Sequence, residues 1–266
     1  MNHGAHAVSA AGAGGPDISD LTLGRFALVV ELLRPWALFG IYLWLAAWGY
    51  WLLALPVAAA TCFAAFVQMH DAIHNALGLP KRINGAVLAL SALLLLKSGH
   101  ALRATHLRHH GKCLGKDDPE GAPATWPLTR VLFRGPFHIL ALRREALAIA
   151  PKTWRAQLVE TAATALLLAG AILHYVASGS AVGLWYWAVA AGISATMPLW
   201  AAYIPHRVAE ANPAVRAAAR LARFFTPVLS SFAYHHVHHR FPKVPTALLP
   251  VAAGRAGHDE GCDHEH

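Results

Sequence analysis

The chain has 266 residues, of which 56% are hydrophobic and only 14% are charged. Water-soluble domains usually carry about 25% charged residues, so this composition argues against a soluble domain and predicts a membrane protein. The net charge of +8 does not indicate a nucleic-acid partner, because basic residues beside membrane spans follow membrane topology and attract anionic lipid headgroups.

The two ends of the chain differ from its middle. The first residues are rich in Gly and Ala and lack the basic start and apolar core of a cleavable signal peptide. We therefore expect a disordered N-terminal segment over residues 1–25, a membrane domain over residues 26–250 and a polar tail over residues 251–266.

Long apolar runs predict the membrane spans. Trp36–Leu55 carries no charge, and after Pro56 the uncharged run continues over Val57–Met69. Two later runs, Thr161–Ala177 and Ala181–Ile204, are also uncharged apart from one histidine in the first of them. A helix of about 20 apolar residues crosses a bilayer, so these runs predict four transmembrane helices in two hairpins.

The basic residues predict the orientation. Lys and Arg lie in the N-terminal segment, in 75–157 or after Ile204, whereas the expected turns at Pro56 and at 178–180 carry none. The positive-inside rule then places both termini and the middle segment in the cytoplasm. A shorter apolar run, Gly85–Leu96, is compatible with a buried, re-entrant or interfacial segment.

Three histidine clusters follow these runs, with the spacings HxxxH, HxxHH and HxxHH. Residues three and four apart share one face of a helix, with side-chain roots about 5–6 Å apart. A lone histidine at the end of the fourth run lies at the same expected depth. The candidate metal ligands are His70, His74, His106, His109, His110, His206, His235, His238 and His239.

Nine imidazoles indicate two metal ions, because one ion rarely takes more than six ligands. Imidazole suits zinc, copper, iron and nickel alike, but structural zinc sites are four-coordinate and often use cysteine. The three cysteines, Cys62, Cys113 and Cys262, have no spacing typical of a metal site or a disulfide framework. The surplus of ligands favours two iron ions that activate O2 and attack unactivated C–H bonds.

Carboxylates near the clusters are candidates for supporting the ligands. Asp71 and Asn75 adjoin the first cluster, and Asp117 and Asp118 lie in an acidic turn after the second. A carboxylate that accepts the second N–H of a ligating histidine fixes the tautomer and the orientation of the ring. The whole pattern predicts an all-α integral membrane protein with a cytoplasmic, histidine-rich helical cap.

The three boxes, with hairpin spans before the first and the third, resemble the membrane fatty acid desaturase superfamily over Trp36–Pro250. Within that superfamily the chain is most similar to the carotenoid ring hydroxylases and ketolases, although Thr246 stands where those enzymes usually have Trp. The matching segments are His70–Asn75, Thr105–His110, Asp117–Glu120, Ile204–Arg207, Tyr234–His239, Pro242 and Pro245.

The resemblance implies a di-iron enzyme in which the nine histidines hold two iron ions and O2 is the cosubstrate. It also implies a lipid-soluble substrate and a separate electron donor such as ferredoxin, because the sequence has no haem or iron–sulfur motif. Hydroxylation or ketolation of a carotenoid ring is the first hypothesis. Acyl-lipid desaturation or fatty-acyl hydroxylation is the second.

A third hypothesis is a membrane protein that binds or transports metal without redox chemistry. Such a protein needs polar residues along a path through its spans. In this chain the second, third and fourth spans contain few of them, namely Gln68, Glu160 and His174.

Overall fold

The computed structural model describes residues 18, 20–207, 212–222 and 228–256. Every regular element within these residues is helical, which confirms the all-α class. The helices are α1 (Arg25–Ala47), α2 (Trp51–Ile73), α3 (Lys81–Leu94), α4 (Gly99–Lys112), α5 (Leu128–Ile149), α6 (Trp154–Ser178), α7 (Val182–Met197), α8 (Ile204–Arg207), α9 (Pro213–Ala222), α10 (Val228–Ala233), α11 (His235–Arg240) and α12 (Leu249–Ala256).

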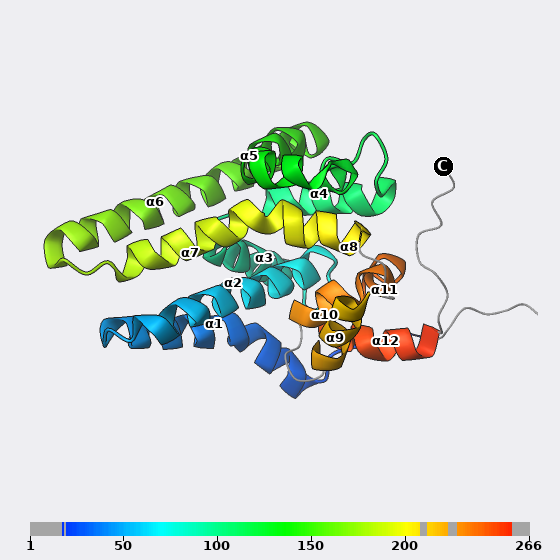
Figure 1. Cartoon of the computed structure of the whole chain (residues 1–266), viewed down its shortest axis with the longest axis horizontal. Coiled ribbons are helices and arrows are strands. Elements are labelled where there is room, and N and C mark those ends of the chain that lie inside the picture. The colour runs from blue at the N-terminus through cyan, green and yellow to red at the C-terminus, as the bar shows by residue number, and fades with distance from the viewer. Residues whose placement is uncertain (1–17, 19, 208–211, 223–227, 257–266) are drawn as a thin grey trace, which may run out of the picture.

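Four of the described segments are long and apolar enough to cross a membrane, as predicted. They are Arg25–Ala47, Trp51–Ile73, Pro151–Ser178 and Val182–Arg207. α1 packs against α2 and α6 against α7, and α2 also contacts α7. Figure 1 shows the turns after α1 and after α6 at one end of the molecule, while α4, α8 and α11 lie at the other.

Helix α2 is the central element of this bundle. Half of its most apolar stretch is buried within the protein, against 17% for each of the other three spans. The other spans therefore present most of their apolar side chains to the surroundings, as expected for helices that contact lipid. The first histidine cluster lies at the C-terminal end of this best-packed span.

The predicted turn at Pro56 is wrong. The chain reverses at Gly49, which has a φ of +77° and separates α1 from α2. Only glycine adopts this left-handed conformation without a steric cost. Pro56 is the sixth residue of α2, where it interrupts a single backbone hydrogen bond and the helix continues.

The polar residues within the spans join helices to one another. Gln68 Nε2 donates to the backbone oxygens of Glu31 and Leu32 at 2.8 and 3.0 Å, and its Oε1 accepts from Ser91 Oγ at 2.6 Å. Gln68 thus connects α1, α2 and α3, and its buried amide finds its hydrogen-bond partners within the protein.

The short apolar run corresponds to α3, which packs against α2 and buries Leu88 and Ala92. The chain then bends by 103° into α4. Ser98 caps α4 by accepting from Ala101 N at 3.2 Å, and its hydroxyl donates to Glu160 of α6 at 2.6 Å. These bonds fix the direction of the helix that carries the second histidine cluster.

A second, smaller apolar cluster extends the fold beyond the predicted limits of the membrane domain. Leu21, Leu249 and Ala252 are buried in it. α12 therefore includes part of the expected polar tail, and Leu21 packs although it lies in the expected disordered segment. The remainder of the tail, 257–266, and most of the N-terminal segment, 1–17 and 19, lie outside the described residues.

Gly49→Ala should destabilise the protein by about 1–2 kcal/mol, because alanine in a left-handed backbone conformation is strained. The added Cβ meets no neighbour, so the backbone strain is the only expected cost. Gly40→Ala is the matched control: Gly40 is helical, its added Cβ also meets nothing, and alanine favours a helix. Thermal unfolding in detergent measures both variants. Equal midpoints would contradict the assigned turn.

Candidate metal centre

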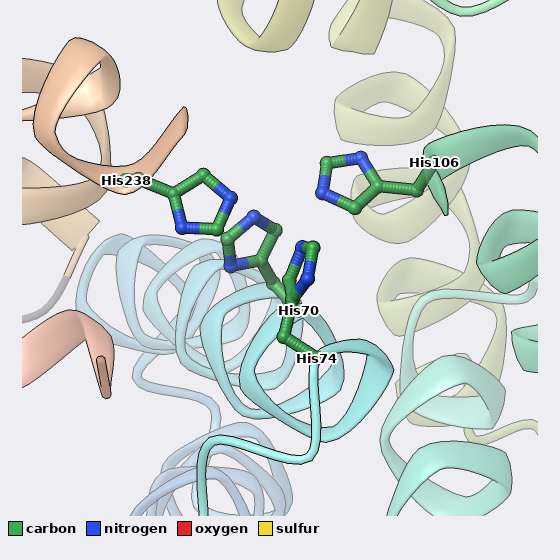
Figure 2. A group of neighbouring side chains, drawn as sticks. All are labelled: His70, His74, His106 and His238. Atoms are coloured by element: carbon green, nitrogen blue, oxygen red, sulfur yellow. The ribbon is translucent and has the colours of Figure 1, made fainter. Parts of the chain in front are cut away.

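The nine candidate histidines come together from α2 and its C-cap residue and from α4, α8 and α11, and they divide into two groups. In the first group, ligand atoms of His70, His74, His106 and His238 lie within 4.8 Å of one another. Figure 2 shows their rings converging from three separate helices. His110 belongs to this group as well, because its Nε2 is 3.2 Å from that of His106 and 2.9 Å from that of His238.

The second group is a ring of four Nε2 atoms. His109 is 3.2 Å from His206, and His206 is 3.0 Å from His235. His235 is 3.0 Å from His239, which is 3.2 Å from His109 and closes the ring. The two groups therefore contain five and four histidines.

Each HxxHH box contributes to both groups. His106 and His110 lie in the first group, while His109 lies in the second. In the third box the outer pair, His235 and His239, lies in the second group, and the remaining residue, His238, lies in the first. Helix geometry explains this division, since residues four apart differ by only about 40° around the axis whereas adjacent residues differ by about 100°.

The nitrogen separations fit metal coordination. Ligand nitrogens about 2.0–2.1 Å from one ion lie roughly 2.9–3.4 Å from their neighbours, whether the angles are octahedral or tetrahedral. The six Nε2–Nε2 separations given above fall in this range, from 2.9 to 3.2 Å. In addition, His74 Nε2 is buried without a hydrogen-bond partner. A buried polar atom of this kind needs a partner, and a bound cation provides one.

Two carboxylates orient the ligands of the second box. His106 Nδ1 donates to Glu120 Oε1 at 2.6 Å, and His109 Nδ1 donates to Asp118 Oδ2 at 2.7 Å. With the proton on Nδ1, each ring directs the lone pair of Nε2 into its group. Thr105 Oγ1 donates to Glu120 at 3.1 Å and so fixes this carboxylate in turn.

Most of the rings outside the spans are uncharged. Burial, with smaller effects from neighbouring imidazoles, lowers the pKa of His74 to about 2 and that of His110 to about 3. Burial also lowers the pKa of His106 and His238 far below the usual value. Burial opposes protonation of His109 too, but the hydrogen bond to Asp118 and the charges of Glu120 and Asp118 together outweigh it and raise the pKa. Neutral imidazole is the form that binds metal.

The other residues that were predicted to support the ligands, namely Asp71, Asn75 and Asp117, make different contacts. Asp71 is 3.8 Å from His70 Nδ1 and instead accepts from Thr246 N at 3.1 Å and from Thr246 Oγ1 at 2.5 Å. Asn75 adopts a left-handed conformation, and its Oδ1 accepts from Asn84 Nδ2 at 3.1 Å. Asp117 is exposed. Thr246 thus joins the segment after the third box to α2, directly beside His70.

His206 reaches the second group through an irregular end of the fourth span. α7 widens into the π-helical segment η3 (Pro198–Tyr203) before the short helix α8. Such segments often occur at functional sites. The next residue, Arg207, donates from Nε to Ala124 O at 2.7 Å, so the Pro-His-Arg motif is anchored to the loop that follows Asp118 and Glu120.

Two residues that sequence reasoning did not assign to the site lie in it. Glu120 ends the acidic run that contains Asp117 and Asp118, from which carboxylates that support His109 or His110 are expected, and it bonds His106 instead. Cys113 has its sulfur in the second group, with ligand atoms of His109, His206 and His239 within 4.8 Å. The spacing HxxHHxxC was the available signal, because Cys113 follows His109 by one helical turn.

A cavity of about 280 Å³ adjoins the first group. Three of the candidate ligands and Glu120 border it, and its other walls are largely aromatic and aliphatic. Its lining residues are Phe63, Phe66, His70, His106, Glu120, Trp200, Ala201, Ala218, Ser231, Phe232 and His235.

Apolar spans, two histidine groups and an adjoining apolar cavity define a membrane protein with a candidate two-metal centre. The fatty acid desaturase family matches residues 43–260, so the chain belongs to that family. Membership indicates an oxidoreductase of a generally iron-dependent family. No curated protein and no solved structure matches the chain.

Gly121→Ala should weaken metal binding by roughly 10–100-fold, the usual effect of losing a group that supports a ligand. A Cβ on Gly121 would overlap Asp118 Oδ2 and lie 3.0 Å from His109 Nδ1, which displaces the carboxylate from the ring. Gly111→Ala is the control, since its Cβ meets nothing and the residue lies in the same region. Metal content after dialysis against a chelator measures both. Equal retention would contradict the role of Asp118.

Proposed function

We propose that the chain is a membrane-bound, O2-dependent di-iron oxygenase that hydroxylates or ketolates the ring of a carotenoid. The observation that carries this proposal is the apolar cavity bordered by His70, His106 and His235. An apolar group in this cavity would lie directly beside the candidate metal ligands.

The five histidines of the first group would hold one iron and the four of the second group the other. With both irons bound, the centre would pass electrons from the donor to O2 and would supply the oxidising power to cleave a C–H bond. Hydroxylation consumes two electrons and two protons, and one oxygen atom enters the product while the other leaves as water. Two such steps at one carbon, followed by loss of water, give a ketone.

The aromatic walls of the cavity favour binding of an apolar ring over water. Trp200 contacts Phe63 and Phe66 edge-on, with ring centroids 5.3 and 4.8 Å apart, and Phe66 stacks on His70 at 6.0 Å. Such surfaces bind apolar groups through contact area and exclude water from the reacting carbon. A cavity with such walls favours the bulky ring at the end of a carotenoid.

Glu120 can hold a proton next to the cavity. Its side chain is 16% exposed, borders the cavity and accepts from His106 Nδ1 at 2.6 Å. Burial raises the pKa of this carboxyl to about 7. At neutral pH Glu120 therefore exists in both protonation states, which suits a group that exchanges protons during oxygen chemistry.

The orientation and the electron supply are part of the same proposal. By the positive-inside rule, both termini and the histidine-bearing end of the bundle face the cytoplasm. A ferredoxin or a similar soluble protein would deliver electrons from that side. The site end contains the long basic segment between α2 and α6, whereas the opposite turns carry no Lys or Arg.

Acyl-lipid desaturation or hydroxylation is the second candidate, and the family match itself favours it. The same histidines and the same hydrogen abstraction would serve a straight chain. Metal transport without redox chemistry is less consistent with the fold, because Gln68 and Glu160 are bonded between helices rather than lining a path.

Expression in a bacterium that makes β-carotene, together with a ferredoxin and its reductase, tests the proposal. We expect carotenoids that have gained one oxygen atom, or an oxygen with loss of two hydrogens, in mass spectra of the lipid extract. His109→Ala should abolish these products while the protein remains in the membrane, because the variant lacks a ligand of the second group and the partner of Asp118.

Other outcomes assign the substrate differently. New unsaturated or hydroxylated acyl chains with unchanged carotenoids would support the acyl-lipid alternative. Full product formation by His109→Ala would contradict the metal centre. Purified protein that holds zinc and supports no oxidation in either lipid pool would favour the non-redox hypothesis.

A further inference from the structure

The second histidine group includes a sulfur atom. Cys113 directly follows α4 as its C-cap, one helical turn after His109. Residues four apart lie on the same face of a helix, so the thiol and the His109 ring are presented to the same side. The ligand atoms of His109, His206, His239 and Cys113 all lie within 4.8 Å of one another.

This spacing is close to that of ligands on a shared metal ion. A thiolate binds zinc at about 2.3 Å and an imidazole at about 2.0–2.1 Å, so a sulfur and a nitrogen on one ion are at most roughly 4.4 Å apart. The four ligand atoms, which lie within 4.8 Å of one another, are near this bound. The three histidines come from α4, α8 and α11, and Cys113 therefore joins a set already assembled by tertiary structure.

The same carboxylate positions the histidine and the cysteine. Asp118 Oδ2 accepts from His109 Nδ1 at 2.7 Å and from Leu114 N at 2.9 Å. Leu114 directly follows Cys113 and has a left-handed φ of +56°. Such a conformation is costly for leucine and requires support from its surroundings. Asp118 thus fixes the turn after α4 next to the second group, and Cys113 is positioned together with that turn.

We propose that Cys113 binds, as a thiolate, the metal ion of the second histidine group. This inference rests on the two-metal centre of the proposed function. It makes the two metal positions chemically different: the first has imidazole ligands only, and the second adds a softer, negatively charged sulfur. A thiolate stabilises the more oxidised state of its ion, so the second iron is the harder of the two to reduce.

X-ray absorption of the zinc-loaded, full-length protein in detergent tests the ligand directly. The Cys62→Ala, Cys262→Ala double variant keeps Cys113 as its sole cysteine. It should retain a metal–sulfur shell at about 2.3 Å beside the nitrogen shell, at roughly half a sulfur per zinc. Adding Cys113→Ser should remove that shell and leave the nitrogens. Cys62 is buried in the helical bundle, 4.0 Å from Tyr186, and lies outside the histidine groups.

Alkylation of the same double variant provides a second readout that needs no change at Cys113. Iodoacetamide should modify Cys113 at least tenfold more slowly with zinc bound than after chelation. Two zinc ions per chain with nitrogen shells only would overturn the role of Cys113 and leave the proposed function intact. Protein that binds no metal would overturn both.

Discussion

Nine imidazole rings share one buried region, and every ring nitrogen there must find a proton, a hydrogen-bond acceptor or a metal ion. Burial keeps rings such as His106, His235 and His238 uncharged, so each offers one lone pair and one proton. Glu120 and Asp118 take the outward protons of His106 and His109. The lone pairs then point at one another, and two cations would satisfy them together.

The rest of the fold brings these rings together and holds them. Asp71 joins the segment after the third box to α2, Arg207 ties the end of the fourth span to the loop at Ala124, and Glu160 anchors the start of α4 to α6. Each bond lies next to a histidine-bearing element and involves only protein groups. The ligands are therefore positioned before a metal binds, which increases affinity because less order is lost on binding.

Local periodicity made the helices and the histidine boxes predictable, because spacing within a helix depends on neighbouring residues alone. The partners of each ligand are not predictable in this way: helix geometry separates His106 from His109, but only the packing of α4 against other helices decides which histidines each of them meets. Cys113 was overlooked because its partners are histidines rather than other cysteines. The turn at Gly49 was misplaced because Pro56, the stronger helix breaker in soluble proteins, is tolerated inside an apolar span.

Anomalous diffraction at the iron absorption edge, from crystals of the iron-loaded protein, tests the central claim most directly. The account predicts two anomalous peaks per chain. One should lie among His70, His74, His106, His110 and His238, and the other among His109, His206, His235 and His239. A single peak, or peaks away from these rings in protein that retains its iron, would contradict it.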